Sequence, residues 1–263
     1  MKIYNIKYLV LFYTFFIVAM SVFSQSTPAK DTNYTAPNGL KQGYWEKYDK
    51  NNILKYKGTF KNNIPVDTFK YYDAKGFAQA VLFFSNNGKT AGAKLYYANG
   101  KIKGSGLYVN NKKNGLWKYY NEKGILIAED FYKQDKKNGV CKIYYANGKI
   151  SDEKTWKDDL KSGEWKQYYY TDGAIKLQAY CKDDFLDGQF KFYYPSGIVM
   201  TSGIYERSLK QGIWTFLNEE GKLAKKKTYE KGKLIKEEIF IKNEDKDIIN
   251  IKDIKKTEEN NDK

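Results

Sequence analysis

Apolar and polar residues alternate in short blocks along the chain, and the blocks recur every 24 residues, with one interval of 25. Residues two apart on a strand point to the same face of a sheet. One such face is marked in each block by a large ring, or by Ala or Cys in two copies. This ladder consists of Trp45, Phe69, Ala93, Trp117, Cys141, Trp165, Phe190 and Trp214. The alternation predicts β-strands along most of the chain.

Two further ladders, both rich in glycine, enclose each block. Asn or Asp often precedes the second ladder, as at Asn99 and Asn147, and Asn-Gly pairs favour positive φ and tight hairpin turns. Each block is therefore predicted to be one β-hairpin. The opening positions are Gly43, Asp67, Ala91, Gly115, Gly139, Gly163, Gly188 and Gly212, and the closing positions are Asn52, Gly76, Gly100, Gly124, Gly148, Gly173, Gly197 and Gly221.

Short polar connectors, such as residues 110–114 and 134–138, join one hairpin to the next. A parallel pairing would need a crossover of a dozen or more residues, so the strands must be antiparallel. About eight hairpins predict an all-β fold, an elongated single-layer twisted sheet of sixteen strands. The extra residue between Gly163 and Gly173 predicts a β-bulge and a bend at that point. A tyrosine that recurs beside the aromatic ladder, as at Tyr144, is expected on the opposite face.

The two ends of the chain differ from the repeats. Lys2 and Lys7 precede an uncharged apolar run, which is typical of a signal peptide. We therefore expect residues 1–24 to be a signal peptide that is cut after Ser24, with an uncleaved membrane anchor as the alternative. Residues 25–38 are expected to be a linker, residues 39–240 the repeat domain, and residues 241–263 a charged tail that is partly capping or disordered.

The charge suggests a class of partner. The 263 residues contain 46 Lys and Arg against 31 Asp and Glu, a formal net charge of +15. Such a surplus favours anionic partners, and for an exported chain we rank a protein, an acidic glycan or a lipid surface above nucleic acid. The connectors are expected to place four lysines along one edge of the sheet as a basic stripe, but solvated turns rank above a binding role for them. This stripe comprises Lys112, Lys113, Lys136 and Lys137.

The side chain that most often serves in catalysis is missing from the sequence. It contains no histidine, which removes the commonest general base and metal ligand, so we predict no catalytic residue, cofactor or metal. Paired acids such as Asp158 and Asp159 suit Ca²⁺ but are interpreted as solvated turn residues. Cys141 and Cys181 are expected to be free buried thiols, because three strands at ~4.8 Å each separate them too far for a disulfide.

The pattern Gly-x-Trp-x-x-Tyr-Tyr-x-x-x-Gly, with Asn-Gly-Lys turns at 99–101 and 147–149, resembles the bacterial variant of the MORN repeat over about residues 38–240. The resemblance implies a single-layer sheet of hairpins that serves as a scaffold or binding surface. Some bacterial proteins of this kind are described as YwqK-type antitoxins, and eukaryotic MORN arrays are linked to membrane attachment and protein assembly. The positions that carry the pattern include Trp45, Trp117, Trp165, Trp214, Gly100, Gly124, Gly148, Gly173, Gly197 and Gly221.

These features together predict a secreted or periplasmic, non-enzymatic scaffold of the cell envelope. It would bind a protein or an anionic envelope component through the long face of its sheet. The alternative is an antitoxin or immunity-like inhibitor of one partner toxin. An enzyme ranks third, because a one-layer sheet offers a groove at best rather than a cleft with converging polar groups. The sequence leaves the oligomeric state open.

Overall fold

The computed structural model describes residues 32–241. Within them all regular structure is β-strand, and 18 strands form one antiparallel sheet, which confirms the predicted fold class. The strands are β1 (Gly43–Tyr48), β2 (Leu54–Lys61), β3 (Ile64–Tyr72), β4 (Ala78–Ser85), β5 (Thr90–Tyr96), β6 (Ile102–Val109), β7 (Lys112–Tyr120), β8 (Leu126–Lys133), β9 (Lys136–Lys137), β10 (Gly139–Tyr144), β11 (Ile150–Lys157), β12 (Leu160–Tyr168), β13 (Ile175–Lys182), β14 (Phe185–Tyr193), β15 (Val199–Glu206), β16 (Leu209–Leu217), β17 (Leu223–Glu230) and β18 (Lys233–Ile239).

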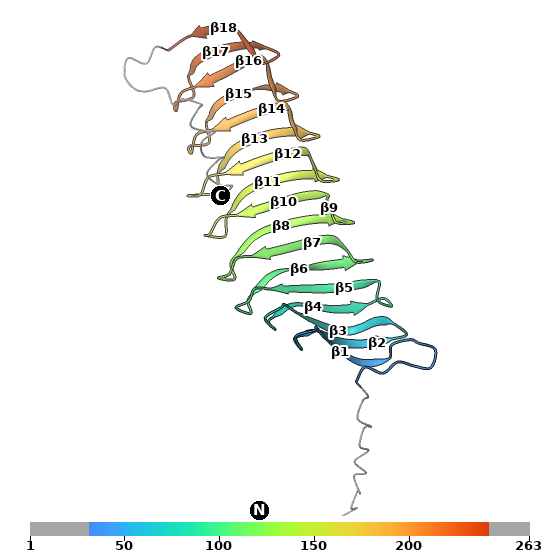
Figure 1. Cartoon of the computed structure of the whole chain (residues 1–263). Coiled ribbons are helices and arrows are strands. Elements are labelled where there is room, and N and C mark those ends of the chain that lie inside the picture. Colours follow the sequence, from blue (N-terminus) through green and yellow to red (C-terminus); the bar gives the residue numbers. More distant parts are fainter. Residues whose placement is uncertain (1–31, 242–263) are drawn as a thin grey trace, which may run out of the picture.

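Neighbours in sequence are neighbours in the sheet, so the chain runs back and forth as a continuous meander from β1 to β18 (Figure 1). The expected sixteen strands become 18 for two reasons. The opening strand of the fifth hairpin is divided into β9 and β10, which both pair with β8. In addition, β18 follows the eighth hairpin and lies inside the repeat domain expected for residues 39–240. The predicted signal peptide and almost all of the predicted tail lie outside the described residues.

The connectors form tighter turns than the sequence suggested. Asn110 and Asn111 have φ of 50° and 62°, and Asp158 and Asp159 have φ of 51° and 71°. Two successive residues with positive φ are the signature of a type I′ hairpin turn. Each turn also bonds to the previous one, as where the Asp135 N–H donates to the Lys113 carbonyl at 3.0 Å. The connectors therefore stack along one edge of the sheet.

The predicted hairpin turns at the closing ladder are present, but their geometry differs from the prediction. Gly100 alone has positive φ, 79°. Asn99 instead accepts the Lys101 N–H on its Oδ1 at 3.0 Å, while the Tyr97 N–H donates to the Lys101 carbonyl at 2.9 Å. The turn around each closing position is thus a five-residue loop, in which only the glycine needs the left-handed conformation.

The single extra residue lies in a loop rather than in a β-bulge, so that prediction was wrong. The Tyr169 N–H donates to the Ala174 carbonyl, five positions on, whereas in the preceding repeat Tyr145 donates to Lys149, four positions on. β12 keeps the nine residues that β7 has. A longer loop leaves the strand pairing intact, and this explains why the sheet passes through the sixth repeat without interruption.

The predicted aromatic face carries the core. Trp117 and Phe69 are 0 % and 1 % exposed, although nothing but one sheet lies beneath them. Burial is possible because each ring covers a small residue on the preceding strand. Ser105 pairs with Lys118 but Leu107 pairs with Asn114, so the chain bulges at this point. Gly115 provides the bulge with a φ of 72°. We call this surface the tryptophan face.

The first described residues cover the edge of β1. The Asn33 N–H donates to the Tyr44 carbonyl at 2.9 Å, and the Asn33 Oδ1 accepts the Glu46 N–H at 2.9 Å. The segment thereby satisfies backbone groups that an open edge would expose. In the part of the chain that the structure describes, no helix has the length and apolarity needed to cross a membrane.

Candidate binding face

The face opposite the tryptophans carries one continuous row of side chains that runs the length of the molecule. Directly opposed residues on antiparallel strands share a face, and each long strand contributes one member to this central row. Lysine occupies the third residue after the opening position in six repeats. The central row reads Glu46, Lys57, Lys70, Val81, Lys94, Ser105, Lys118, Glu129, Lys142, Glu153, Lys166, Gln178, Lys191, Ser202, Thr215, Lys226 and Glu238.

In the middle of the molecule the central row is neutralised by ion pairs. Lys118 contacts Glu129 at 3.1 Å and Lys142 contacts Glu153 at 3.2 Å. Lys166 contacts Glu164, which lies two residues earlier on the same strand, at 2.7 Å. We call this surface the ion-pair face.

Tyrosine hydroxyls reinforce these carboxylates. The Tyr144 hydroxyl donates to Glu129 at 2.8 Å and the Tyr168 hydroxyl donates to Glu153 at 2.5 Å, which places the recurring tyrosine on the face predicted for it. Burial and the bond to Glu129 raise the pKa of Tyr144 to about 12. Burial tends to raise the pKa of Glu129, but the bonds from Tyr144 and Lys118 outweigh it and lower that pKa. Glu129 therefore stays ionised at neutral pH.

An apolar row runs beside the central row, two residues after it on one strand and two residues before it on the antiparallel neighbour. Its large members are between 40 and 60 % exposed, although they stand on a regular sheet that could have carried polar residues. Polar residues such as Glu164 and Gln189 interrupt the row, but exposed apolar side chains that cluster on one surface are typical of interaction sites. The exposed apolar row comprises Phe83, Leu107, Phe131, Val140, Tyr180, Ile204 and Ile213.

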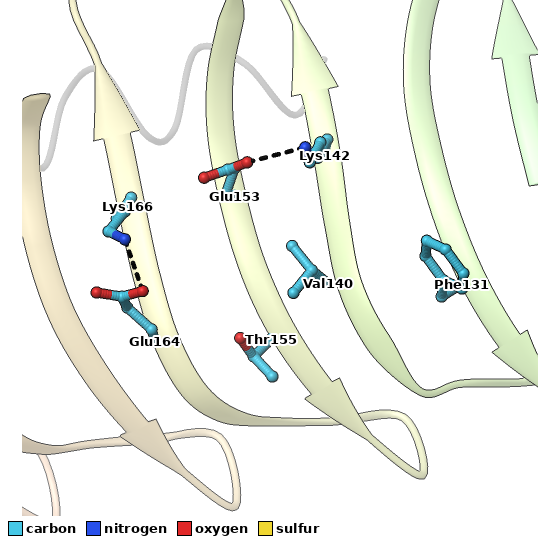
Figure 2. A pocket seen from close by; sticks show the side chains of 7 residues that line it. All are labelled: Phe131, Val140, Lys142, Glu153, Thr155, Glu164 and Lys166. Carbon is cyan, nitrogen blue, oxygen red and sulfur yellow. Dashed lines mark ion pairs between the residues drawn. The ribbon is translucent and has the colours of Figure 1, made fainter. Parts of the chain in front are cut away.

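The two rows enclose an open hollow of about 410 Å³ at the centre of the ion-pair face. Figure 2 shows side chains from β8, β10, β11 and β12 that project to the same side around it. Phe131 and Val140 form its apolar side, and the pairs Lys142–Glu153 and Lys166–Glu164 form its polar side. The arrangement can hold an apolar group next to a hydrogen-bonding one. Both acids beside the hollow, Glu153 and Glu164, are paired with a lysine.

The four lysines of the predicted basic stripe are divided between the two faces. Lys113 lies on the tryptophan face, where its Nζ is 4.7 Å from the Trp117 ring centroid and donates to the Tyr119 hydroxyl at 2.9 Å. Lys137 pairs with Asp130 at 3.2 Å. Lys112 and Lys136 are exposed at the connector edge. A lysine at one connector position thus covers aromatic rings, while the lysine before it is exposed to solvent.

The two cysteines and the connector acids lie in environments that suit a structural role. Cys141 and Cys181 are both free and buried, as predicted, and burial raises the pKa of Cys141 to about 11. Asp159 accepts the Lys137 N–H at 2.7 Å, so this acid holds a connector. Between residues 32 and 241 no three His, Cys, Asp or Glu side chains gather as they would around a metal ion.

Six stretches of the chain match the family described as MORN repeat variant, namely residues 41–62, 93–110, 113–134, 137–158, 186–206 and 210–231. The chain is a MORN-repeat protein. MORN repeats are generally binding or scaffold modules and generally non-catalytic. A search of curated proteins finds no match.

The matches omit the second and sixth repeats, yet the structure gives both the same hairpin as the others. The second has Asp67 where most repeats have glycine, with a φ of 58°, and the sixth contains the longer loop. The MORN array is therefore continuous over eight hairpins. Sequence reasoning missed the ion-pair face, although six lysines at one repeat position were a visible signal.

Proposed function

We propose that this MORN-repeat protein is an exported scaffold that binds a protein or envelope component along its ion-pair face. The observation that carries the proposal is the exposed apolar row beside the row of lysines and glutamates. The tryptophan face is filled by its own rings, as the burial of Trp117 and Trp214 indicates, so it offers little apolar surface to a partner. The ion-pair face combines apolar contact with charge at a regular spacing.

Export is part of the same proposal and rests on the N-terminal residues. If the signal peptide is removed after Ser24, N-terminal sequencing of protein recovered from the secreting cell should begin at Gln25. An unprocessed chain recovered from the membrane fraction would favour the anchor. An unprocessed chain in the cytosol would contradict export.

The binding surface is tested by replacing exposed members of the apolar row with serine. Phe131→Ser, Ile204→Ser and Ile213→Ser should leave the fold intact, because these side chains are 42, 51 and 60 % exposed. Proteins or glycans captured by the native chain from envelope extract should be lost. Phe77→Ser and Tyr170→Ser are matched controls, because both residues are similarly exposed but lie in the loops at one edge.

The outcome of the capture also separates the two candidate roles. An envelope protein or glycan that depends on the apolar row supports the scaffold. A captured toxin whose activity the chain inhibits would favour the antitoxin role instead. Equal capture by the native chain and the triple variant would contradict a binding role for this face.

A further inference from the structure

The N-terminal part of the ion-pair face differs from its centre. Lys57, Lys70 and Lys94 occupy the same central row as the paired lysines, but within residues 32–241 none of the three has a carboxylate within ion-pair distance. Lys70 and Lys94 are solvent-exposed, and the Lys94 Nζ lies 5.8 Å from the Phe83 ring centroid. This part of the ion-pair face therefore carries positive charge that no neighbouring carboxylate neutralises.

The apolar row has a gap at the same place. Phe83, Gly92 and Leu107 are directly opposed on β4, β5 and β6, and the two apolar side chains are 45 and 40 % exposed. A Cβ built on Gly92 would meet nothing within 4 Å, and its φ is not positive. Neither the turn geometry nor a close neighbour therefore requires glycine here. The other repeats carry a side chain at this position, namely Tyr44, Thr68, Leu116, Val140, Glu164, Gln189 and Ile213.

Lys94 and the gap are two residues apart along β5, a separation of about 7 Å. Lys70 lies two strands away on β3, about 10 Å from Lys94 at the usual strand spacing. An extended polypeptide places alternate side chains at the same spacing, so it can present a carboxylate to the lysines and an apolar group to the gap. A phosphate group by itself would satisfy the lysines but would leave the gap empty, whereas a polypeptide offers both groups at the spacing of one strand. The charge and the shape of the patch therefore favour an acidic polypeptide.

We infer that this patch binds an acidic segment of a partner protein, with carboxylates on Lys70 and Lys94 and an aromatic or aliphatic side chain in the gap at Gly92. The inference rests on the proposed function, since it names the chemistry of the partner for one part of the ion-pair face. It also explains why the lysines at the two positions are left without internal partners.

Two defined polymers test the inference with the full-length mature chain. Poly-L-glutamate offers carboxylates alone, and a random copolymer of glutamate and tyrosine adds the apolar group. The copolymer should bind more tightly than poly-L-glutamate. Lys70→Glu with Lys94→Glu should weaken copolymer binding about tenfold. Lys50→Glu with Lys123→Glu is the matched control, because these exposed loop lysines change the net charge equally and should leave binding nearly unchanged.

Filling the gap provides the second arm. Gly92→Leu should fold normally, since its side chain enters open space, and circular dichroism with thermal unfolding would verify this. The substitution should reduce the affinity for the copolymer and leave the affinity for poly-L-glutamate unchanged. Equal effects of the patch and control lysine variants, or no effect of Gly92→Leu on the copolymer, would overturn the inference.

Heparin and phosphatidylglycerol vesicles complete the set of probes. Tighter binding of either than of the copolymer, lost in the Lys70→Glu, Lys94→Glu variant, would show a patch for another anion and would also overturn the inference. The proposed function has a separate readout. If partners captured from extract are lost on serine substitution of the apolar row but retained by the lysine variant, the scaffold role stands and the acidic-segment inference fails.

Discussion

The indole ring of Trp117 lies directly on Gly106 of the preceding strand, so that a methyl group added to this glycine would overlap the ring. The same relationship joins Phe69 to Gly58 and Trp214 to Gly203. A ring buried against a bare backbone explains how a one-layer sheet has side chains that solvent does not reach.

Gly106→Ala should therefore destabilise the protein by about 1–3 kcal/mol, because the added methyl group overpacks a site with no free volume. Gly92→Ala is the matched control on the neighbouring strand, where the new Cβ meets nothing within 4 Å. Urea unfolding of the two variants would measure the difference. Equal midpoints would show that the ring shifts at little cost and that the contact is not a constraint on the fold.

Lys113 contributes to the same packing by covering rings. Its Nζ lies 4.7 Å from the Trp117 centroid and 4.9 Å from the Tyr132 centroid. Lys113→Met keeps most of the stem but removes the charge and the bond to Tyr119, so we expect a loss of about 1 kcal/mol. Lys112→Met, at the exposed neighbouring position, should change the unfolding midpoint little. A loss of equal size in both variants would argue against the cation–π contact.

The connector acids are predicted to act through the backbone. Asp159 accepts the Lys137 N–H at 2.7 Å and has a φ of 71°. Asp159→Ala should cost about 1–2 kcal/mol, since it loses the bond and tolerates that φ poorly. Asp159→Asn should be nearly neutral, because Asn63 already makes the same bond to the Lys41 N–H at 2.7 Å. Thermal unfolding measures both, and a rise on adding Ca²⁺ in the native chain alone would indicate a cation site instead.

The period and the aromatic ladder were sufficient to predict the fold, because a strand with one packed face needs a large residue at every second position. The sequence also indicates the size of the residue that each ladder side chain covers on the preceding strand. From the second repeat on, the residue eleven positions before the ladder position is usually small ahead of a ring and larger ahead of Ala or Cys. The pairs are Gly58 with Phe69, Leu82 with Ala93, Gly106 with Trp117, Asp130 with Cys141 and Ala179 with Phe190, although Lys154 precedes Trp165 and stacks on it instead, at 4.8 Å.

Turn geometry was harder to predict. Asn99 and Asn111 are the same residue type, but only Asn111 adopts positive φ. The difference comes from where the strands stop pairing. β6 and β7 pair up to Val109 and Lys112, which leaves Asn111 in a two-residue turn, whereas Asn99 lies in a five-residue loop. The ion-pair face was missed for a similar reason, since the pairing of Lys142 with both Glu129 and Glu153 appears only when the strands are in register.

Acid should weaken the centre of the ion-pair face. The bonds from Tyr144 and Lys118, which outweigh the effect of burial, hold the pKa of Glu129 below its ordinary value of 4.5. A carboxylate whose pKa is lower in the folded state contributes stability above the unfolded value and loses it as the pH falls through the folded one. The free energy of unfolding should therefore decrease below about pH 4.5 as Glu129 becomes protonated.

Glu129→Gln isolates this contribution. At neutral pH the variant should be less stable than the native chain by about 1 kcal/mol, because the charged hydrogen bonds are lost, and the difference should shrink toward zero near pH 3. Thermal unfolding at both pH values measures it, with Glu122→Gln, an exposed loop residue, as the control that should match the native chain throughout. A difference that stays constant with pH would mean that Glu129 acts through packing rather than through its charge.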